Sequence, residues 1–309
     1  MSSKIAPRAT ADLAPHATAD LAPHRANRFL IAGAGGMLGT ALQRVLTARG
    51  LEFVAPREGE FDITNRPLVL DAVEAFASGG GGVLLNAAAY TDVERAEDER
   101  DRAFLVNETG AGLLAAAARD AGLGFVHVST DFVFDGAKRG AYVEDDAPHP
   151  MSVYGQSKLA GERAVAAESP DALIVRTAWV FGPNGRNFPG KILELARSRP
   201  RLKVVTDEVG SPTYTMDLAA GLLDLLAAGA TGVVHLANAG SCTRFEMAAE
   251  ILRIAGIQRE LVPVSSAEFP TRAERPRNSV LDCSRAATFG VVMPEWHDAL
   301  ARYLRRDDK

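Results

Sequence analysis

The chain has 309 residues, of which 47% are hydrophobic, so it is long enough to bury a full core in one α/β domain with an additional lobe. Lys and Arg number 34 against 39 Asp and Glu, and the net charge of -5 excludes the strongly basic class of nucleic-acid-binding proteins. The two cysteines cannot build a disulfide framework. Because no signal peptide and no apolar run near the roughly 18 residues that span a bilayer is present, we expect a cytoplasmic protein with no membrane partner.

The amino-terminal segment repeats itself. Residues 9–16 and 17–24 both read ATADLAPH, and neither copy has a periodicity that could bury one face. We therefore expect residues 1–27 to form a disordered tail, with a functional arm as the alternative.

Short apolar runs alternate with stretches of helical spacing after this segment. Continuous apolar strands separated by helices are typical of a parallel sheet that is covered on both faces. The sequence therefore predicts an α/β fold with a doubly wound parallel Rossmann sheet. The expected strands, each given with the helix that follows it, are 28–33 with 36–49, 52–55 with 67–77, 83–86 with 102–120, 124–129 with 154–167, and a last strand at 173–177.

The alternation loosens beyond residue 180. We expect residues 28–180 to form mainly the Rossmann domain and residues 181–309 mainly a smaller lobe over the carboxyl edge of the sheet, where such folds bind their ligands. The expected elements here are helices at 187–197, 216–228 and 244–255, and strands at 202–206, 233–236 and 261–264, of which 233–236 is a candidate to return to the sheet.

Gly33, Gly36 and Gly39 form a GxxGxxG pattern between the first strand and its helix. Glycines there permit a tight turn and let backbone N–H groups approach a pyrophosphate at the helix amino terminus. The pattern favours a dinucleotide cofactor, and the alternative is a turn with close strand-helix packing.

The residues after the second strand bear on the choice of cofactor. An acidic residue often holds the ribose hydroxyls there, but this chain has Arg57, which could face a 2′-phosphate or be a solvated loop arginine. The sequence thus slightly favours NADPH over NADH. Asp62 could cap the next helix or touch the adenine.

Tyr154 and Lys158 are four positions apart at the start of a predicted helix, so they lie on one face. An ammonium beside a phenol lowers the phenol's pKa from about 10. A carbonyl that takes hydride on carbon needs a proton on oxygen, and Tyr154 could supply it. Ser129 and Thr130 end a buried strand at the expected crevice, where Thr130 could bind the carbonyl oxygen. Chance helix composition is the alternative explanation for the Tyr and Lys spacing alone.

Five sequence blocks carry a family resemblance from residue 28 onward. They are NAAAYTDVE at 86–94, STDFVFDG at 129–136, YGQSKLAGE at 154–162, RTAWVF at 176–181 and RPRNSVLD at 275–282. With them the chain resembles the extended short-chain dehydrogenase/reductases and, among these, the dTDP-4-dehydrorhamnose reductase family. The resemblance implies NAD(P)H-dependent reduction of the 4-keto group of a dTDP-4-keto-6-deoxyhexose, giving dTDP-L-rhamnose from dTDP-4-dehydrorhamnose.

The resemblance also implies roles for individual residues. The catalytic trio is Thr130, Tyr154 and Lys158. Alternatives are a helix cap for Asn107, core packing for Trp179 and a surface position for Arg275. Cofactor binding falls to Gly33, Gly36, Met37, Leu38, Gly39, Arg57, Asp62, Ile63, Ala87, Ala88, Tyr90, Asn107, Tyr154 and Lys158, and substrate binding to Thr91, Asp131, Phe132, Trp179, Arg275 and Asn278.

Two positions depart from the family pattern. Phe132 stands where a tyrosine is usual, so a hydroxyl near the substrate is lost. Ala41 stands where some relatives carry a glutamate that helps hold magnesium at a dimer interface. We therefore expect no obligatory metal, and either a monomer or a homodimer.

Three other functions stay open at this point. An antibiotic-sugar 4-ketoreductase, such as a dTDP-dihydrostreptose synthase, would have nearly identical motifs. A non-catalytic relative, such as the regulatory subunit of methionine adenosyltransferase, would not need the intact trio of Thr130, Tyr154 and Lys158. A dehydratase or epimerase of the superfamily is disfavoured, because Asp131 is followed by Phe132 rather than by a second carboxylate.

Overall fold

The computed structural model describes residues 27–306, so all but the last residue of the tail expected at residues 1–27 lies outside the described residues. Within residues 27–306, six strands form one parallel sheet in the order β10-β5-β4-β3-β1-β2. These strands are β1 (Arg28–Ala32), β2 (Glu52–Val54), β3 (Val83–Asn86), β4 (Gly124–Thr130), β5 (Leu173–Thr177) and β10 (Gly232–His235). The chain thus returns to the sheet through β10, which pairs with β5.

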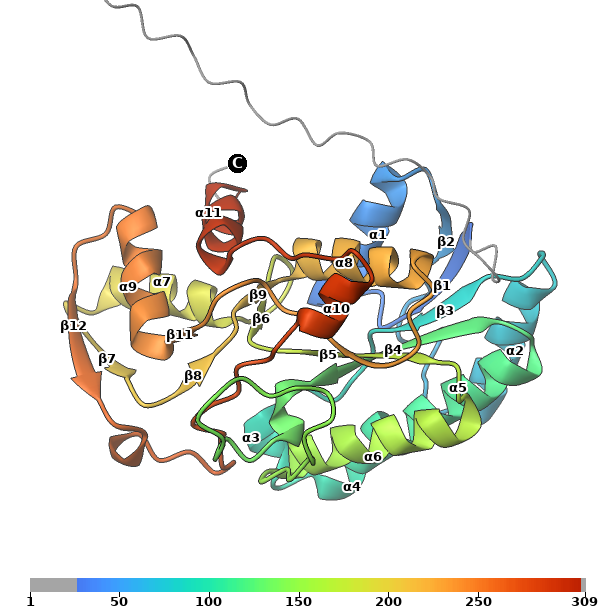
Figure 1. Ribbon diagram of the computed structural model, residues 1–309, viewed down its shortest axis with the longest axis horizontal. Helices are drawn as coiled ribbons and strands as arrows, with labels where there is room; N and C mark the ends of the chain where they lie inside the picture. The colour runs from blue at the N-terminus through green and yellow to red at the C-terminus, as the bar shows by residue number, and fades with distance from the viewer. Residues whose placement is uncertain (1–26, 307–309) are drawn as a thin grey trace, which may run out of the picture.

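Helices cover both faces of the sheet (Figure 1). One face packs on α1 (Met37–Ala48) and α8 (Thr215–Ala227) in an apolar cluster that includes Ile31 and Leu222. The other face packs on α2 (Arg66–Ala77), α5 (Ala111–Asp120) and α6 (Val153–Glu168). These two layers confirm the predicted doubly wound α/β fold.

The helix predicted at 102–120 is divided into three parts. It consists of α4 (Arg100–Phe104), the π-helical segment η1 (Leu105–Gly110) and α5. The wider π turn contains Asn107, whose buried side chain bonds to residues outside the helix. Helical periodicity alone does not reveal such a bulge, since it inserts a single residue into an otherwise regular pattern.

The second lobe has its own apolar cluster, which includes Phe181, Met247 and Trp296. Its helices are α7 (Phe188–Ser198), α9 (Arg244–Ile254) and α11 (Trp296–Arg306), and β7 (Arg201–Val205) pairs there with β12 (Glu260–Val264). Figure 1 shows this lobe beside the carboxyl end of the sheet. The remaining short elements are α3 (Val93–Ala96), η2 (Asp131–Val133), β6 (Val180–Phe181), β8 (Val209–Gly210), β9 (Thr213–Tyr214), β11 (Cys242–Thr243), η3 (Ser266–Glu268) and α10 (Ser284–Thr288).

Candidate active site

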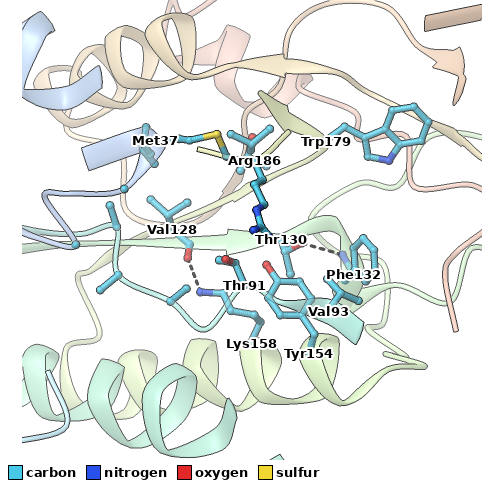
Figure 2. Close-up of a pocket in the computed structure, with 18 of the residues that line it drawn as sticks. Met37, Thr91, Val93, Val128, Thr130, Phe132, Tyr154, Lys158, Trp179 and Arg186 are labelled. Carbon is cyan, nitrogen blue, oxygen red and sulfur yellow. Dashed lines mark hydrogen bonds between the residues drawn. The ribbon is translucent and has the colours of Figure 1, made fainter. Parts of the chain in front are cut away.

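A cavity of about 1520 Å³ connects the glycine loop after β1 with the second lobe. Its wall includes residues that follow β1, β3 and β4, together with residues of α6, α7 and α9. The carboxyl ends of parallel strands are where doubly wound folds bind ligands. Thr130, Tyr154 and Lys158 lie in this wall, as Figure 2 shows.

The glycine loop presents bare backbone to the cavity. Gly36 is the N-cap residue of α1, and no side chain caps it. A Cβ on Gly35 would meet nothing within 4 Å, whereas a Cβ on Gly39 would lie 2.2 Å from the carbonyl oxygen of Gly33. Gly39 therefore serves close packing beneath the loop, and the open N–H groups at the start of α1 fit the pyrophosphate of a dinucleotide.

Residues around the loop line the same cavity. Met37 and Leu38 lie at the start of α1, and Arg57, Asp62 and Ile63 lie after β2. The Asp62 carboxylate accepts hydrogen bonds from the backbone N–H and the hydroxyl of Thr64, at 2.9 and 2.7 Å. The expectation that Asp62 caps α2 is wrong, because Asn65 is the N-cap residue of that helix.

Asn107 joins the loop after β3 to the helix that carries Tyr154. Its Oδ1 accepts from the Tyr90 backbone N–H at 2.8 Å, and its Nδ2 donates to the Ser157 hydroxyl at 2.9 Å. Asn107 is therefore not a helix cap. Ala87, Ala88 and Thr91 line the cavity, but Tyr90 does not, because its hydroxyl donates to Glu99 at 3.0 Å.

The predicted catalytic residues come from β4 and α6. The α6 helix begins under the cap of Ser152, whose Oγ accepts from the Gly155 N–H at 3.1 Å. This start places Tyr154 and Lys158 on the face toward the cavity (Figure 2). The Thr130 hydroxyl donates to Asp131 at 3.0 Å and accepts from the Phe132 N–H at 3.2 Å.

The protonation of this group differs from the sequence expectation. Burial raises the pKa of Tyr154 to about 12, although a hydrogen bond with Thr130 opposes the shift. The Lys158 ammonium was expected to lower the Tyr154 pKa, but Lys158 Nζ instead donates to the Val128 carbonyl at 2.7 Å. Burial also lowers the pKa of Lys158 to about 8. Desolvation therefore outweighs the expected charge effect.

Asp131 and Phe132 flank the reacting groups. Asp131 is 2% exposed, and burial raises its pKa to about 6 against the opposing hydroxyls of Ser279 and Thr130. The Phe132 ring packs edge-on against Tyr154 with 5.5 Å between the ring centroids. Both residues line the cavity.

Trp179 lies in the cavity wall and is partly buried against two apolar clusters. Its φ of 45° is unusual for a residue other than glycine, and such strain persists only where neighbours hold it. The Arg244 guanidinium lies 3.4 Å from the Trp179 ring centroid, and a Cβ on Gly210 would lie 2.3 Å from the ring. Arg244 pairs with Glu208 at 3.6 Å.

Arg244 is a cavity residue that the sequence analysis did not single out. The only nearby signal is the T-R-F-E capping box, formed by Thr243 and Glu246, which marks the start of α9 but says nothing of the cavity. Arg186 and Lys191 are further cationic residues of the wall that were not predicted.

The two predicted residues of the RPRNSVLD block have different positions. Arg275 lines the cavity and pairs with Glu94 at 2.6 Å, so it is not a simple surface arginine. Asn278 is not among the cavity residues. Its Nδ2 donates to the carbonyls of Lys138 and Gly140, at 2.7 and 2.9 Å, so the expectation that Asn278 binds substrate is not supported.

Residues 27–306 contain no group of three or more His, Cys, Asp or Glu side chains that could hold a metal ion. None of their helices has the length and apolar character needed to cross a membrane.

Comparisons with known proteins agree with this geometry. The family model described as the RmlD substrate binding domain matches residues 27–308. The chain is 42% identical to a dTDP-4-dehydrorhamnose reductase of Mycolicibacterium smegmatis over 280 residues, which cover 89% of this chain and 84% of the relative. It is 40% identical to a dTDP-4-keto-6-deoxy-D-glucose reductase of Streptomyces niveus over 280 residues, covering 89% and 96% of the two chains.

A solved structure matches as well. The dTDP-4-dehydrorhamnose reductase of Bacillus anthracis in complex with NADP has a TM-score of 0.87 and 35% identity, with 91% of this chain and 99% of that chain covered. The family model and these relatives span nearly all of the described residues. The chain therefore belongs to the dTDP-4-dehydrorhamnose reductase family.

Proposed function

We propose that the protein reduces the 4-keto group of dTDP-4-dehydrorhamnose to give dTDP-L-rhamnose, with NADPH as the preferred reductant. The observation that carries the proposal is that one cavity contains both the uncapped start of α1 and the three side chains Thr130, Tyr154 and Lys158. A dinucleotide site and a proton donor therefore share one continuous space. The named relatives act on sugar nucleotides of this class.

The proposed cofactor site consists of the cavity residues around the glycine loop. Gly33, Gly36, Met37 and Leu38 would hold the pyrophosphate by their backbone at the amino end of α1. Arg57, at the exposed rim of the cavity, would face the 2′-phosphate that distinguishes NADPH from NADH. Bound NADPH supplies hydride to the carbonyl carbon.

The proton comes from Tyr154 in this scheme. Its raised pKa keeps the phenol protonated at neutral pH, so it can donate to the carbonyl oxygen as that oxygen gains negative charge. Thr130, whose hydroxyl lies beside Tyr154, positions the same oxygen. Without substrate this hydroxyl donates its one hydrogen bond to Asp131, so it must turn from Asp131 to donate to the carbonyl oxygen.

The sugar nucleotide would occupy the part of the cavity toward the second lobe. Trp179, with the Arg244 guanidinium against its ring, would line the hexose site, and Arg275 offers a cation for the diphosphate. Thr91 and Phe132 complete the wall near the reacting carbon. We propose on this basis that residues 28–180 bind mainly the cofactor and residues 181–309 mainly the sugar nucleotide.

A direct assay tests the proposal. The purified protein is mixed with NADPH or NADH and enzymatically generated dTDP-4-dehydrorhamnose, and the sugar product is identified by NMR. Oxidation of NADPH with formation of dTDP-rhamnose is the expected result. Absence of oxidation with either cofactor would contradict the proposal.

A second substrate has a specific observation in its favour. The Streptomyces niveus relative, 40% identical, is named for dTDP-4-keto-6-deoxy-D-glucose, an antibiotic-type precursor with the same 4-keto group. The same assay with this substrate distinguishes the two, since the preferred sugar has the higher kcat/KM. We further infer a cytoplasmic monomer or homodimer, and the free thiols of Cys242 and Cys283 are consistent with a reducing compartment.

A further inference from the structure

A buried chain of polar side chains runs from β3 through β4 to the catalytic helix α6. Asn86 Nδ2 lies 3.0 Å from His127 Nδ1, and His127 Nε2 lies 3.3 Å from Lys158 Nζ. All three residues are at most 2% exposed, so each depends largely on its protein partners for hydrogen bonds. The hydrogen bonds within the chain must therefore be mutually consistent.

The orientation of Asn86 decides which nitrogen of His127 carries the proton. Asn86 Oδ1 accepts from the Ala88 backbone N–H at 3.1 Å, and a backbone N–H can only donate. The other end of the amide, Nδ2, must then face His127 and donate to Nδ1. A neutral imidazole that accepts at Nδ1 carries its proton on Nε2.

The Nε2–H group of His127 points at Lys158 Nζ. An ammonium has three donors and no acceptor, so it would oppose this N–H, whereas a neutral amine has a lone pair to receive it. One amine N–H still donates to the Val128 carbonyl at 2.7 Å. We propose that His127, held in its Nε2–H tautomer by Asn86, is a positioning residue that favours the neutral amine of Lys158.

The proposal rests on the proposed function, in which Lys158 shares the active-site cavity with Tyr154, and extends it to residues that do not line the cavity. The opposite orientation of the Asn86 side-chain amide does not avoid two donors facing each other. It would point the Nδ2 donor of Asn86 at the Ala88 backbone N–H, which is also a donor. A doubly protonated His127 does not fit either, because its Nδ1–H would then face the Asn86 Nδ2 donor.

The charges around Lys158 do not return its pKa to the ordinary value of 10.5. Glu162, one turn along α6, raises the Lys158 pKa, but both of its oxygens already accept from Arg176, at 2.9 and 2.7 Å. Tyr154 and Asp131 share the cavity wall with Lys158, and burial favours the neutral form of each. The other ionisable side chains on α3, α4, η1 and α5, which pack against α6, are exposed or half-buried, namely Glu94, Arg95, Arg100, Asp101, Arg102, Glu108, Arg119 and Asp120.

Burial favours the neutral amine of Lys158, as the Nε2–H tautomer of His127 does. It lowers the pKa of Lys158 to about 8 and the pKa of His127 well below its usual value of 6.5. A donor on the amine lone pair lowers the Lys158 pKa further, because protonation must break that hydrogen bond. Lys158 is then neutral over a wider range of pH than an ordinary lysine.

The test is made on the cofactor-free full chain without substrate. Nitrogen-15 NMR of labelled histidine reports the tautomer of His127, and carbon-13 NMR of labelled lysine reports the pKa of Lys158, with the Lys158→Met variant assigning the signal. We expect the Nε2–H tautomer at neutral pH and a Lys158 pKa at or below about 8. The Nδ1–H tautomer, or a Lys158 pKa near 10.5, would overturn the proposal.

A nearly isosteric variant switches the tautomer. In Asn86→Asp one carboxylate oxygen still accepts a hydrogen bond from the Ala88 backbone N–H. The other oxygen can only accept, so it requires the Nδ1–H tautomer of His127. Nε2 is then an acceptor for the Lys158 ammonium. We expect the proton affinity of Lys158 to rise at least tenfold. The same change in a His127→Phe background measures the effect of the added charge alone.

The test compares the rise in Lys158 proton affinity caused by Asn86→Asp in the wild-type and His127→Phe backgrounds. A larger rise with His127 than with phenylalanine supports the tautomer effect, and equal rises would overturn it. These readings are independent of turnover, so an inactive protein that shows the expected tautomer and Lys158 pKa refutes only the proposed reaction. An active reductase with the other tautomer refutes only the role of His127.

Discussion

Replacing Tyr154 with phenylalanine removes one hydroxyl from the cavity and very little volume. The ring packs edge-on against Phe132, with 5.5 Å between centroids, and this contact survives the change. The lost group is the proposed proton donor, and general-acid steps of this kind contribute roughly 10² to 10⁴ in rate. We therefore expect kcat to fall by that factor, or about 3 to 5 kcal/mol of transition-state stabilisation.

The assay combines turnover with cofactor binding. NADPH oxidation in the presence of dTDP-4-dehydrorhamnose gives kcat, and a fluorescence titration gives the Kd of NADPH, which should stay within about threefold, because the phenol hydroxyl adds less than one hydrogen bond of binding. The matched control is Tyr142→Phe, since Tyr142 is outside the cavity and its hydroxyl bonds to Asp135. Turnover of Tyr154→Phe close to that of the wild type would refute the proton-donor role.

Three further predictions concern charge. Burial raises the pKa of Asp131 from 3.8 to about 6, so the stability it contributes is complete below pH 3.8 and is lost as the pH rises through 6. Asp131→Asn should therefore gain about 2 to 3 kcal/mol over the wild type between pH 4 and pH 7 in urea denaturation, and an unchanged difference would contradict this. Arg176→Met leaves Glu162 buried without its ion-pair partner and should lower the free energy of unfolding by about 3 to 5 kcal/mol, of which Arg176→Met with Glu162→Gln should recover part. Arg57→Ala should weaken NADPH binding about tenfold and leave NADH binding unchanged, as measured by fluorescence titration, whereas equal losses would exclude contact with the 2′-phosphate.

The sequence predicts the sheet well because its strands are continuous apolar runs. All four residues of β3 are buried, and β4 and β5 are also almost entirely buried, so each strand is mainly apolar despite buried polar residues such as His127 and Arg176. The two-residue strands β6, β8, β9 and β11 carry no such pattern. They exist because distant segments meet in the second lobe, as where Val209 pairs with Thr243.

The candidate site is predictable where it depends on local spacing. Tyr154 and Lys158 reach one cavity because a helix places residues four apart on one face. Asn278 illustrates the limit, since its amide is used on the carbonyls of Lys138 and Gly140, which no local pattern indicates. Arg244 reaches the Trp179 ring only through the packing of α9 on the lobe. The roles of the predicted residues stay predictions.

Burial moves the ionisable groups of this cavity toward their neutral forms. The pKa values of Tyr154 and Asp131 rise, and the pKa of Lys158 falls. A neutral phenol is the form that a ketone reduction requires at the start of each turnover, because the proton must be present before the oxygen becomes negative. Cations that would attract phosphates, such as Arg57 and Lys191, lie at exposed positions of the wall. The fold therefore separates ligand capture, which needs charge, from proton donation, which needs its absence.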